Sequence, residues 1–197
     1  MSKKPVIWDL CSGLGGWSEA FVQAGWIVVR IDNAPIVQHI PHTFSLDVRN
    51  WLDWAYDLPQ PDLIVASPPC LEFSQAFHAP GPVARRDGLD FQPDFSILSA
   101  CKDIIKEFKP TWWAIENVVG SIKPFKPYLG RYKQKVGPFV IWGTIPFLPL
   151  SDFIPHSKDI GSAGDPLRSN IRAKIPFEIS FELLSCWNSQ KTLLEFI

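Results

Sequence analysis

Short apolar runs alternate with helix-like segments over the first 120 residues, and this alternation restricts the chain to a small set of folds. The runs with the length and composition of buried strands are residues 6–10, 27–32, 63–67 and 112–117. Residues 16–24 and 94–108 place apolar side chains at helical spacing. Strands separated by helices pair in parallel through right-handed crossovers, with helices on both faces of the sheet. The pattern therefore predicts an α/β fold built on a mostly parallel sheet.

The length and composition of the chain fit one domain. With 197 residues, 46% of them hydrophobic, the chain can bury one substantial core but not two. Its four cysteines are far apart and show no paired CxxC spacing, which argues against zinc or a disulfide framework. No segment is apolar over a length that would span a membrane. We expect a single domain over residues 1–197, present as a cytoplasmic monomer that binds neither metal nor membrane.

The segment DLCSGLGG, residues 9–16, connects the first strand to the first helix. Its glycines Gly13, Gly15 and Gly16 allow a tight turn and a close approach of the backbone to a ligand. The segment lacks both the GxGxxG spacing of a dinucleotide site and the Lys-Ser/Thr ending of a phosphate-binding loop. A cofactor that ends in an amino acid suits it better than a pyrophosphate, although an ordinary glycine-rich turn explains the segment alone equally well.

Two carboxylates follow the next strands. Asp32 closes the second strand, where it can accept hydrogen bonds from both hydroxyls of a ribose. Asp47 follows a third short strand and can accept a hydrogen bond from an adenine amino group. Each residue alone is more often a solvated loop acid. Together, in this order, they predict a nucleoside pocket beyond the carboxyl ends of the strands.

Cys70 and Glu116 form a candidate reactive pair. Cys70 follows a strand and two prolines, so it is held on a rigid turn that faces the ligand crevice. A free cysteine is usually a buried structural residue, but the polar loop argues against that interpretation, and a thiolate there would be a nucleophile. Glu116 begins ENV at the end of the strand expected beside the Cys70 strand. A carboxylic acid that faces a thiolate across one crevice makes a nucleophile and acid pair.

The ordered set DLCSGLGG, Asp32, Asp47, SPPC and ENV resembles the cytosine-5 DNA methyltransferase family, over about the first 120 residues. The resemblance implies a Rossmann-like fold with an antiparallel last strand, S-adenosyl-L-methionine as the cofactor, and double-stranded DNA as the partner. It also implies that Cys70 bonds to carbon 6 of a flipped-out cytosine and that Glu116 holds a proton at ring nitrogen 3.

The resemblance further assigns individual residues to the cofactor, the substrate and the reaction. The residues implied in cofactor binding are Asp9, Cys11, Gly13, Leu14, Gly15, Gly16, Asp32, Asn33, Asp47, Val48, Ser67 and Pro69. Those implied in substrate binding are Ser74, Arg85, Arg86, Asn117 and Arg168, and those implied in catalysis are Cys70, Glu116 and Arg172. We expect the loop 71–92 to close over the base as a mobile lid, with Arg85 and Arg86 on phosphate, although a solvated charge pair explains these arginines equally well.

The chain departs from the family pattern in several respects. Cys11 stands where members usually have phenylalanine, and Leu71 follows Cys70 where they usually have glutamine. The Gln-x-Arg-x-Arg strand is missing, so Arg168 and Arg172 are its nearest substitutes. The large target-recognition domain is missing too, which leaves residues 120–170, including the basic segment 121–135, to contact DNA. This compact form is similar to short members carried by phages or prophages, which implies a bacterial cytoplasm.

Two other functions fit the same residues. Methylation of RNA would use the same pocket, since both reactions act on a flipped or single-stranded base. A non-catalytic accessory protein that binds cofactor and DNA would agree with the reduced recognition region and the net charge of −1. The presence of Cys70, Glu116 and the glycine turn counts against this second alternative.

Overall fold

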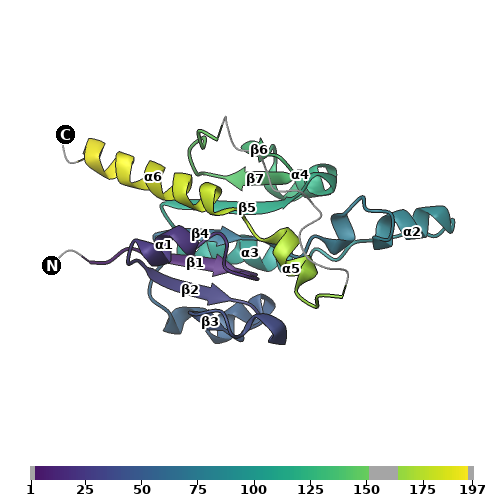
Figure 1. Cartoon of the computed structure of the whole chain (residues 1–197), viewed down its shortest axis with the longest axis horizontal. Helices are drawn as coiled ribbons and strands as arrows, with labels where there is room; N and C mark the ends of the chain where they lie inside the picture. The colour runs from purple at the N-terminus through teal and green to yellow at the C-terminus, as the bar shows by residue number, and fades with distance from the viewer. Residues whose placement is uncertain (1–2, 151–163, 195–197) are drawn as a thin grey trace.

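The computed structural model describes residues 3–150 and 164–194, with side chains up to residue 190. A seven-stranded sheet forms its centre, in the order β3-β2-β1-β4-β5-β7-β6 (Figure 1). The strands are β1 (Val6–Leu10), β2 (Ile27–Ile31), β3 (Thr43–Phe44), β4 (Leu63–Ala66), β5 (Trp112–Val118), β6 (Gln134–Val136) and β7 (Phe139–Gly143). Strands β1 to β5 pair in parallel with one another, while β7 runs antiparallel to β5 and β6. The predicted mostly parallel sheet with an antiparallel last strand is therefore confirmed.

Helices connect these strands and cover the sheet. The α-helices in the described part of the chain are α1 (Glu19–Gln23), α2 (Pro80–Arg86), α3 (Ser96–Phe108), α4 (Ile122–Leu129), α5 (Arg168–Ala173) and α6 (Phe177–Leu194). Short 3-10 helices are η1 (Pro35–Val37), η2 (Val48–Asp53), η3 (Ala55–Asp57), η4 (Leu71–Phe73) and η5 (Val119–Ser121). None of the helices among residues 3–150 and 164–194 is both long and apolar enough to cross a membrane.

The sheet divides the core into two layers. Along β1, the fully buried Val6, Trp8 and Leu10 contribute to the layer that includes α3 and α4. The intervening Ile7 contributes to the opposite layer, which includes α1 and α6. This alternation follows from the two-residue period of a strand, and it explains why β1 is apolar at every position except Asp9. The expectation of helices on both faces is confirmed.

Several element boundaries differ from the predictions. The first helix begins at Glu19 rather than at residue 16, because residues 12–18 form the turns of the glycine segment. The predicted loop 71–92 contains η4 and α2, and α2 starts at Pro80, a residue whose fixed φ suits a first helical turn. The basic segment 121–135 contains α4 and the start of β6. The last helix, predicted over 176–187, continues to Leu194.

Part of the expected recognition region, residues 151–163, lies outside the described residues. Its remaining parts are η5, α4, β6, β7 and the beginning of α5. The single-domain boundaries 1–197 and the recognition role of residues 120–170 stay predictions.

A buried arginine supports the glycine turn from below. Arg30, on β2, is 5% exposed. Its Nε donates a hydrogen bond to Ser18 Oγ at 2.8 Å, and its Nη2 donates to the carbonyl oxygen of Gly15 at 3.2 Å. Ser18 Oγ in turn donates to Asp9 Oδ2 at 2.6 Å. A Cβ at position 15 would lie 2.5 Å from the Arg30 guanidinium, and Gly15 has a φ of +69°, so this position requires glycine.

Ser18 thus links two buried charged groups by hydrogen bonds, since its hydroxyl accepts from Arg30 and donates to Asp9. Burial raises the pKa of Asp9 to about 7, although the hydrogen bond from Ser18 and the charge of Arg30 lower it. Burial lowers the pKa of Arg30, while the Asp9 charge raises it. Removal of the serine hydroxyl would leave the guanidinium and the carboxylate each short of a partner.

A Ser18→Ala variant should therefore be destabilised by about 1–3 kcal/mol, the cost of buried polar groups left without a hydrogen bond. Urea unfolding at pH 7 measures the change. Ser189→Ala, at an exposed position of α6, is the matched control and should change the free energy of unfolding by less than about 0.5 kcal/mol. Equal stability of the two variants would contradict the role given to Ser18.

Candidate active site

The carboxyl ends of the parallel strands meet at one edge of the sheet, and most of the predicted site residues lie there (Figure 1). The glycine turn follows β1, and Asp32 follows β2. These two segments are joined directly, since the Gly13 amide donates to Asp32 Oδ2 at 2.8 Å. Asp32 Oδ1 accepts from the Ala34 amide at 2.9 Å. The turn and the carboxylate therefore form one unit before any ligand binds.

The glycine turn leaves room for a ligand. Gly13 has a φ of +51°, and a Cβ added there would meet no atom within 4 Å. Open space above a turn of positive-φ residues, beside the half-buried Asp32, fits a nucleoside cofactor with an amino acid end. Gly16 has a different function: a Cβ there would overlap the carbonyl oxygen of Ile175, so Gly16 lets the segment after α5 pack on the turn. An ion pair of 2.7 Å between Lys174 and Glu19 holds the same contact.

The structure brings Asn33 and Asp47 together at the same edge. Asn33 Nδ2 donates to Asp47 Oδ2 at 3.3 Å. The Arg49 guanidinium also binds this carboxylate, and its hydrogen bond lowers the pKa of Asp47. Asp47 is thus ionised and partly occupied by Arg49. Its predicted hydrogen bond to an adenine amino group stays a prediction, as do the cofactor contacts of Leu14 and of the buried Val48.

Two residues assigned to the cofactor point into the protein instead of away from it. Asp9 is fully buried under the turn, where Ser18 and Arg30 surround it. Cys11, in the left-handed region with a φ of 53°, packs against the core layer that contains Cys101. The Cys101 thiol and burial together raise the pKa of Cys11 well above its usual value. Both residues shape the turn, and their contact with a cofactor stays a prediction.

Glu116 is held by a hydrogen-bond chain that crosses three segments. The β4–β5 register pairs Ala66 with Ile115, which places Ser67 beside Glu116. Ser67 Oγ donates to Glu116 Oε2 at 3.1 Å and accepts from Trp17 Nε1 at 3.1 Å. Ser67, assigned above to the cofactor, therefore orients the acid.

The electrostatics of this pair favour a protonated acid. Glu116 is 6% exposed, and burial raises its pKa to about 8, although the hydrogen bond from Ser67 lowers it. Burial and the negative charge of Glu116 raise the pKa of Cys70, while a backbone hydrogen bond lowers it. At neutral pH Glu116 therefore holds its proton. A neutral Glu116 does not repel a thiolate at Cys70, and it can donate that proton to a ligand.

Asn117 fixes the loop that carries Cys70. Its side chain is 1% exposed; Nδ2 donates to the carbonyl oxygen of Pro68 at 2.8 Å, and Oδ1 accepts from the Val118 amide at 2.9 Å. Gly120 brings the next residues closer still, since a Cβ there would overlap the carbonyl oxygen of Phe73. The segments after Cys70 and after Glu116 are therefore in contact. The substrate contact predicted for Asn117 stays a prediction, and so does a ligand contact of the exposed Pro69.

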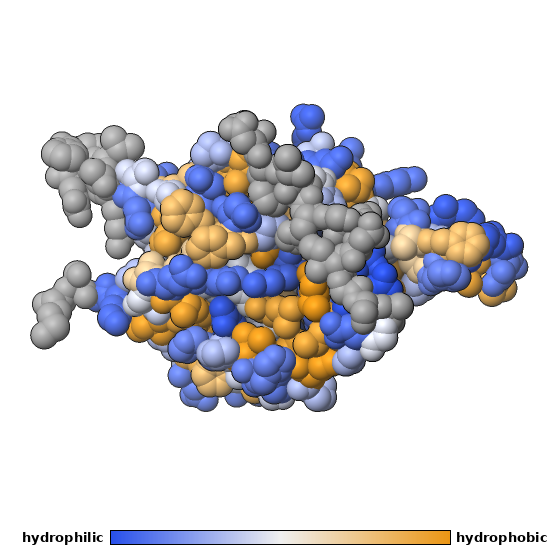
Figure 2. Space-filling model, in the orientation of Figure 1, coloured by the Kyte–Doolittle hydropathy of each residue, from blue (hydrophilic) through white to orange (hydrophobic). Residues whose placement is uncertain are grey.

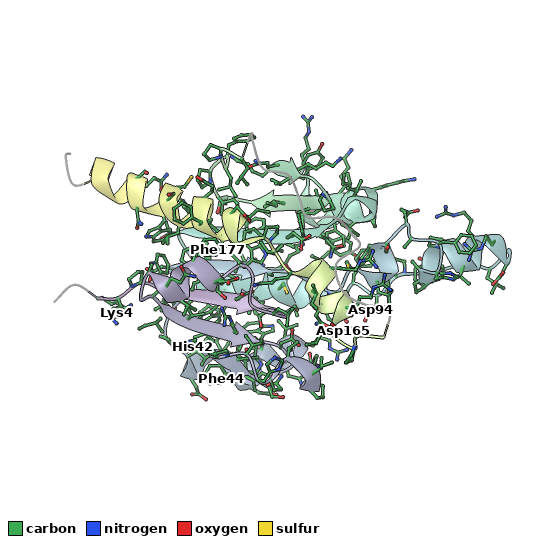
Figure 3. The ribbon with its side chains drawn as sticks, in the orientation of Figure 1. Lys4, His42, Phe44, Asp94, Asp165 and Phe177 are labelled. Carbon is green, nitrogen blue, oxygen red and sulfur yellow. The ribbon has the colours of Figure 1, made fainter. Side chains whose placement is uncertain are left out.

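The predicted lid, residues 71–92, contains an arm that projects from the body and carries α2 (Figure 1). Figure 2 shows hydrophilic and hydrophobic surface mixed on it. Asp94, labelled in Figure 3, lies at its base, where the Asp94 amide donates to Glu72 Oε2 at 2.6 Å. On the arm, Arg86 Nη1 donates to the carbonyl oxygen of Phe77 at 2.7 Å, with the guanidinium 3.9 Å from the Phe77 ring. Arg86 is thus engaged within the arm, and closure of the arm stays a prediction.

The other substrate residues occupy different places. Ser74 Oγ accepts from the Ala76 amide at 3.1 Å at the start of the arm. Arg172 is exposed on α5, and neither a hydrogen bond nor an ion pair to any described residue fixes its guanidinium. Arg168, on the same helix, is half-buried, with an Nε that has no hydrogen-bond partner in the described ranges. The structure brings α5 to the glycine turn, but the roles of these arginines stay predictions.

Sequence reasoning missed three supporting residues. Arg30 was a detectable signal, because it is a lone cation in the apolar run IVVRID. Gly120, directly after ENVV, was another. Trp17 carried no such signal, since nothing in the sequence places its indole nitrogen beside Ser67.

Comparison with known proteins agrees with this arrangement. The family model of C-5 cytosine-specific DNA methylases matches residues 6–129, which is more than half of the chain. The Type II methyltransferase M.HgiDI of Herpetosiphon aurantiacus is 33% identical over 121 residues, 56% of this chain and 36% of the relative. M.AplI of Arthrospira platensis is 30% identical over 132 residues, 64% of this chain and 35% of the relative.

The chain therefore spans about a third of the length of these two relatives. A third relative, the Type II methyltransferase M.HgiGI of H. aurantiacus, is 33% identical over 121 residues that make up 87% of its own length. The matched region contains the glycine turn, Asp32, Cys70 and Glu116. The chain belongs to the C-5 cytosine-specific DNA methylase family.

Proposed function

We propose that this protein methylates carbon 5 of cytosine in DNA, with S-adenosyl-L-methionine as the methyl donor. The observation that carries the proposal is the buried, Ser67-bound Glu116 beside the Cys70 thiol, at the same sheet edge as the glycine turn. The match to the family of C-5 cytosine-specific DNA methylases favours DNA over RNA. The presence of both reactive groups in one site favours an enzyme over a non-catalytic binding protein.

Carbon 5 of cytosine is a weak nucleophile, and Cys70 and Glu116 together would make it more reactive. The Cys70 thiolate bonds to carbon 6, and the displaced electron pair moves through the ring as nitrogen 3 takes the proton of Glu116. Carbon 5 is then part of an enamine. S-adenosyl-L-methionine, held by the glycine turn and Asp32, would supply a methyl group to this carbon and leave as a neutral thioether when its sulfur–methyl bond breaks. A base then takes the carbon-5 proton, Cys70 leaves as the thiolate, and nitrogen 3 returns its proton to Glu116, which restores the ring. Because Ser67 binds Oε2, the other oxygen of Glu116 is left to carry the proton.

The target base must leave the DNA helix to reach Cys70, at a cost of a few kcal/mol of unstacking. We propose that the chain acts as a single-domain monomer in a bacterial cytoplasm. Residues 120–170, with the exposed Lys133 and Lys135 at the β6 edge of the sheet, would contact the DNA.

A Cys70→Ser variant should lose methylation almost completely, because an alcohol does not supply the thiolate nucleophile. Incubation with tritiated-methyl S-adenosyl-L-methionine and mixed duplex DNA, followed by nucleoside chromatography, should place label in 5-methyldeoxycytidine for the wild type only. Cys186→Ser, on α6, is the matched control and should retain activity. Near-normal activity of Cys70→Ser would refute the covalent mechanism.

Asp32→Ala should weaken cofactor binding before any other property. The variant loses the acceptor for the Gly13 amide as well as the proposed ribose contact, so we expect an increase in Kd of about 10-fold or more, in line with one or two lost charge-assisted hydrogen bonds. Isothermal titration with S-adenosyl-L-methionine measures it. The exposed Asp53→Ala is the control and should bind normally. An unchanged Kd for Asp32→Ala would show that the cofactor does not bind at this edge of the sheet.

The activity of the wild type should fall as the pH rises above about 8, since Glu116 must be protonated to act. In Glu116→Gln the rate should be low and this decline absent. Ser67→Ala removes the hydrogen bond that lowers the pKa of Glu116, so its decline should shift to higher pH. Profiles of kcat/KM between pH 6 and 10 test all three proteins.

Stability provides an independent readout for Glu116. The pKa of Glu116 in the folded protein, about 8, lies above its ordinary value of 4.5. Its contribution to the free energy of unfolding is therefore complete below pH 4.5 and is lost as the pH rises through 8. Urea unfolding of Glu116→Gln should lose less stability than the wild type between pH 5 and 9. Identical profiles would show that Glu116 is ionised in the folded protein.

A further inference from the structure

A cavity of about 440 Å³ lies between the arm and the body of the protein, and the proposed reaction does not use it. Its volume is within the range of about 300–1,000 Å³ that is typical of small-ligand sites. The arm contributes Gly81 and Arg85, and the body contributes Val119, Ile122 and Lys123. Much of the remaining lining is apolar or aromatic, from Phe73, Phe91 and Pro93.

The cavity is lined by residues that follow the reactive pair closely in the chain. Phe73 is three residues after Cys70, and Val119 is three residues after Glu116. Gly120, whose lack of a Cβ permits contact with the Phe73 carbonyl, joins the two segments where they line the cavity. A polymer whose reacting unit lies between Cys70 and Glu116 would therefore bring a neighbouring unit to this opening.

The charge of the opening favours an anion. Neither the Arg85 guanidinium nor the Lys123 ammonium has an ion-pair partner among residues 3–150 and 164–194. The carboxylate of Glu72, also at the cavity, accepts a hydrogen bond from the Asp94 amide and keeps its charge, so two cations face one carboxylate in the lining. Arg86 differs from its neighbour Arg85, because it is bound to Phe77 and does not line the cavity. Two free cations beside an apolar wall suit a phosphate attached to a flat apolar group.

We propose that this cavity binds the nucleotide next to the target cytosine in the same DNA strand, with its phosphate between Arg85 and Lys123 and its base on the apolar wall. The inference rests on the proposed function. Extrusion of the cytosine breaks the stacking of its neighbour, and a base on an apolar or aromatic surface recovers part of that energy. Such a site would help to hold the substrate strand and to select the sequence around the target cytosine.

The test begins with a duplex pool randomised around one cytosine, methylated by the wild type and read by bisulfite sequencing. The best substrate is then made with an abasic residue on the 5′ or the 3′ side of the cytosine, which keeps the phosphate and removes the base. For one of these two duplexes, wild-type kcat/KM should fall by about 5- to 100-fold, as expected for one lost stacking contact. The other abasic duplex should react nearly normally.

The variants locate this effect in the cavity. Gly81→Leu narrows the cavity without a change of charge, and a Cβ at position 81 would lie 3.4 Å from the Phe91 ring that also lines it. Gly81→Leu should lose activity on the intact duplex and show little further loss on the abasic one. Arg85→Ala and Lys123→Ala should each lower the salt dependence of DNA binding by about one unit of slope. Arg86→Ala and Lys126→Ala are the matched controls and should keep the wild-type ratio between the two duplexes, whatever their overall affinity.

The two levels of the proposal fail in different ways. If the wild type forms no 5-methylcytosine in DNA, the proposed function is refuted and this site with it. If 5-methylcytosine forms but neither abasic residue matters, the cavity does not bind a neighbouring nucleotide. The same conclusion follows if Gly81→Leu keeps the full wild-type sensitivity to the abasic residue.

Discussion

The parallel pairing of β1, β2, β4 and β5 is the constraint on which the rest of this structure depends. Because these strands run in one direction, their carboxyl ends meet at a single edge, and every segment that leaves a strand there begins beside the others. The register of β4 with β5 places Ser67 against Glu116, and the neighbouring ends of β1 and β2 let the Gly13 amide reach Asp32. A shift of one residue in either pair would turn these side chains to the opposite face.

Burial raises the pKa of two acids near this edge of the sheet, Asp9 and Glu116, and the two have different surroundings. Under the glycine turn it raises the pKa of Asp9, and the Ser18 and Arg30 side chains limit the cost by hydrogen bonds and charge. Asp9, Ser18 and Arg30 together stabilise the glycine turn. At Glu116 the same desolvation has little compensation, and the acid stays protonated near neutral pH. A carboxyl group that keeps its proton beside a thiol can assist the attack of that thiol on a polarisable ring without repelling the thiolate.

The contacts around Cys70 link the reaction to its surroundings. Asn117 binds the backbone of the SPPC turn, and Gly120 brings the segment after Glu116 against the segment after Cys70. Gly120 and Phe73 also line the cavity beside the arm, so the segments that follow Cys70 and Glu116 contribute to its shape.

The sequence by itself predicted the mostly parallel sheet and the residues that follow its strands, because the strand period is a local property. The rule that parallel strands end at one edge then placed those residues together. The sequence also located the glycine turn, although not the reason for Gly15, which is the Arg30 guanidinium beneath it. Only the tertiary structure decided that Ser67 orients Glu116, that Arg85 and Arg86 face different partners, and that residues 71–92 form a helix-bearing arm. Those outcomes depend on contacts between segments that are distant in the chain, and no local pattern of residue types encodes such distances.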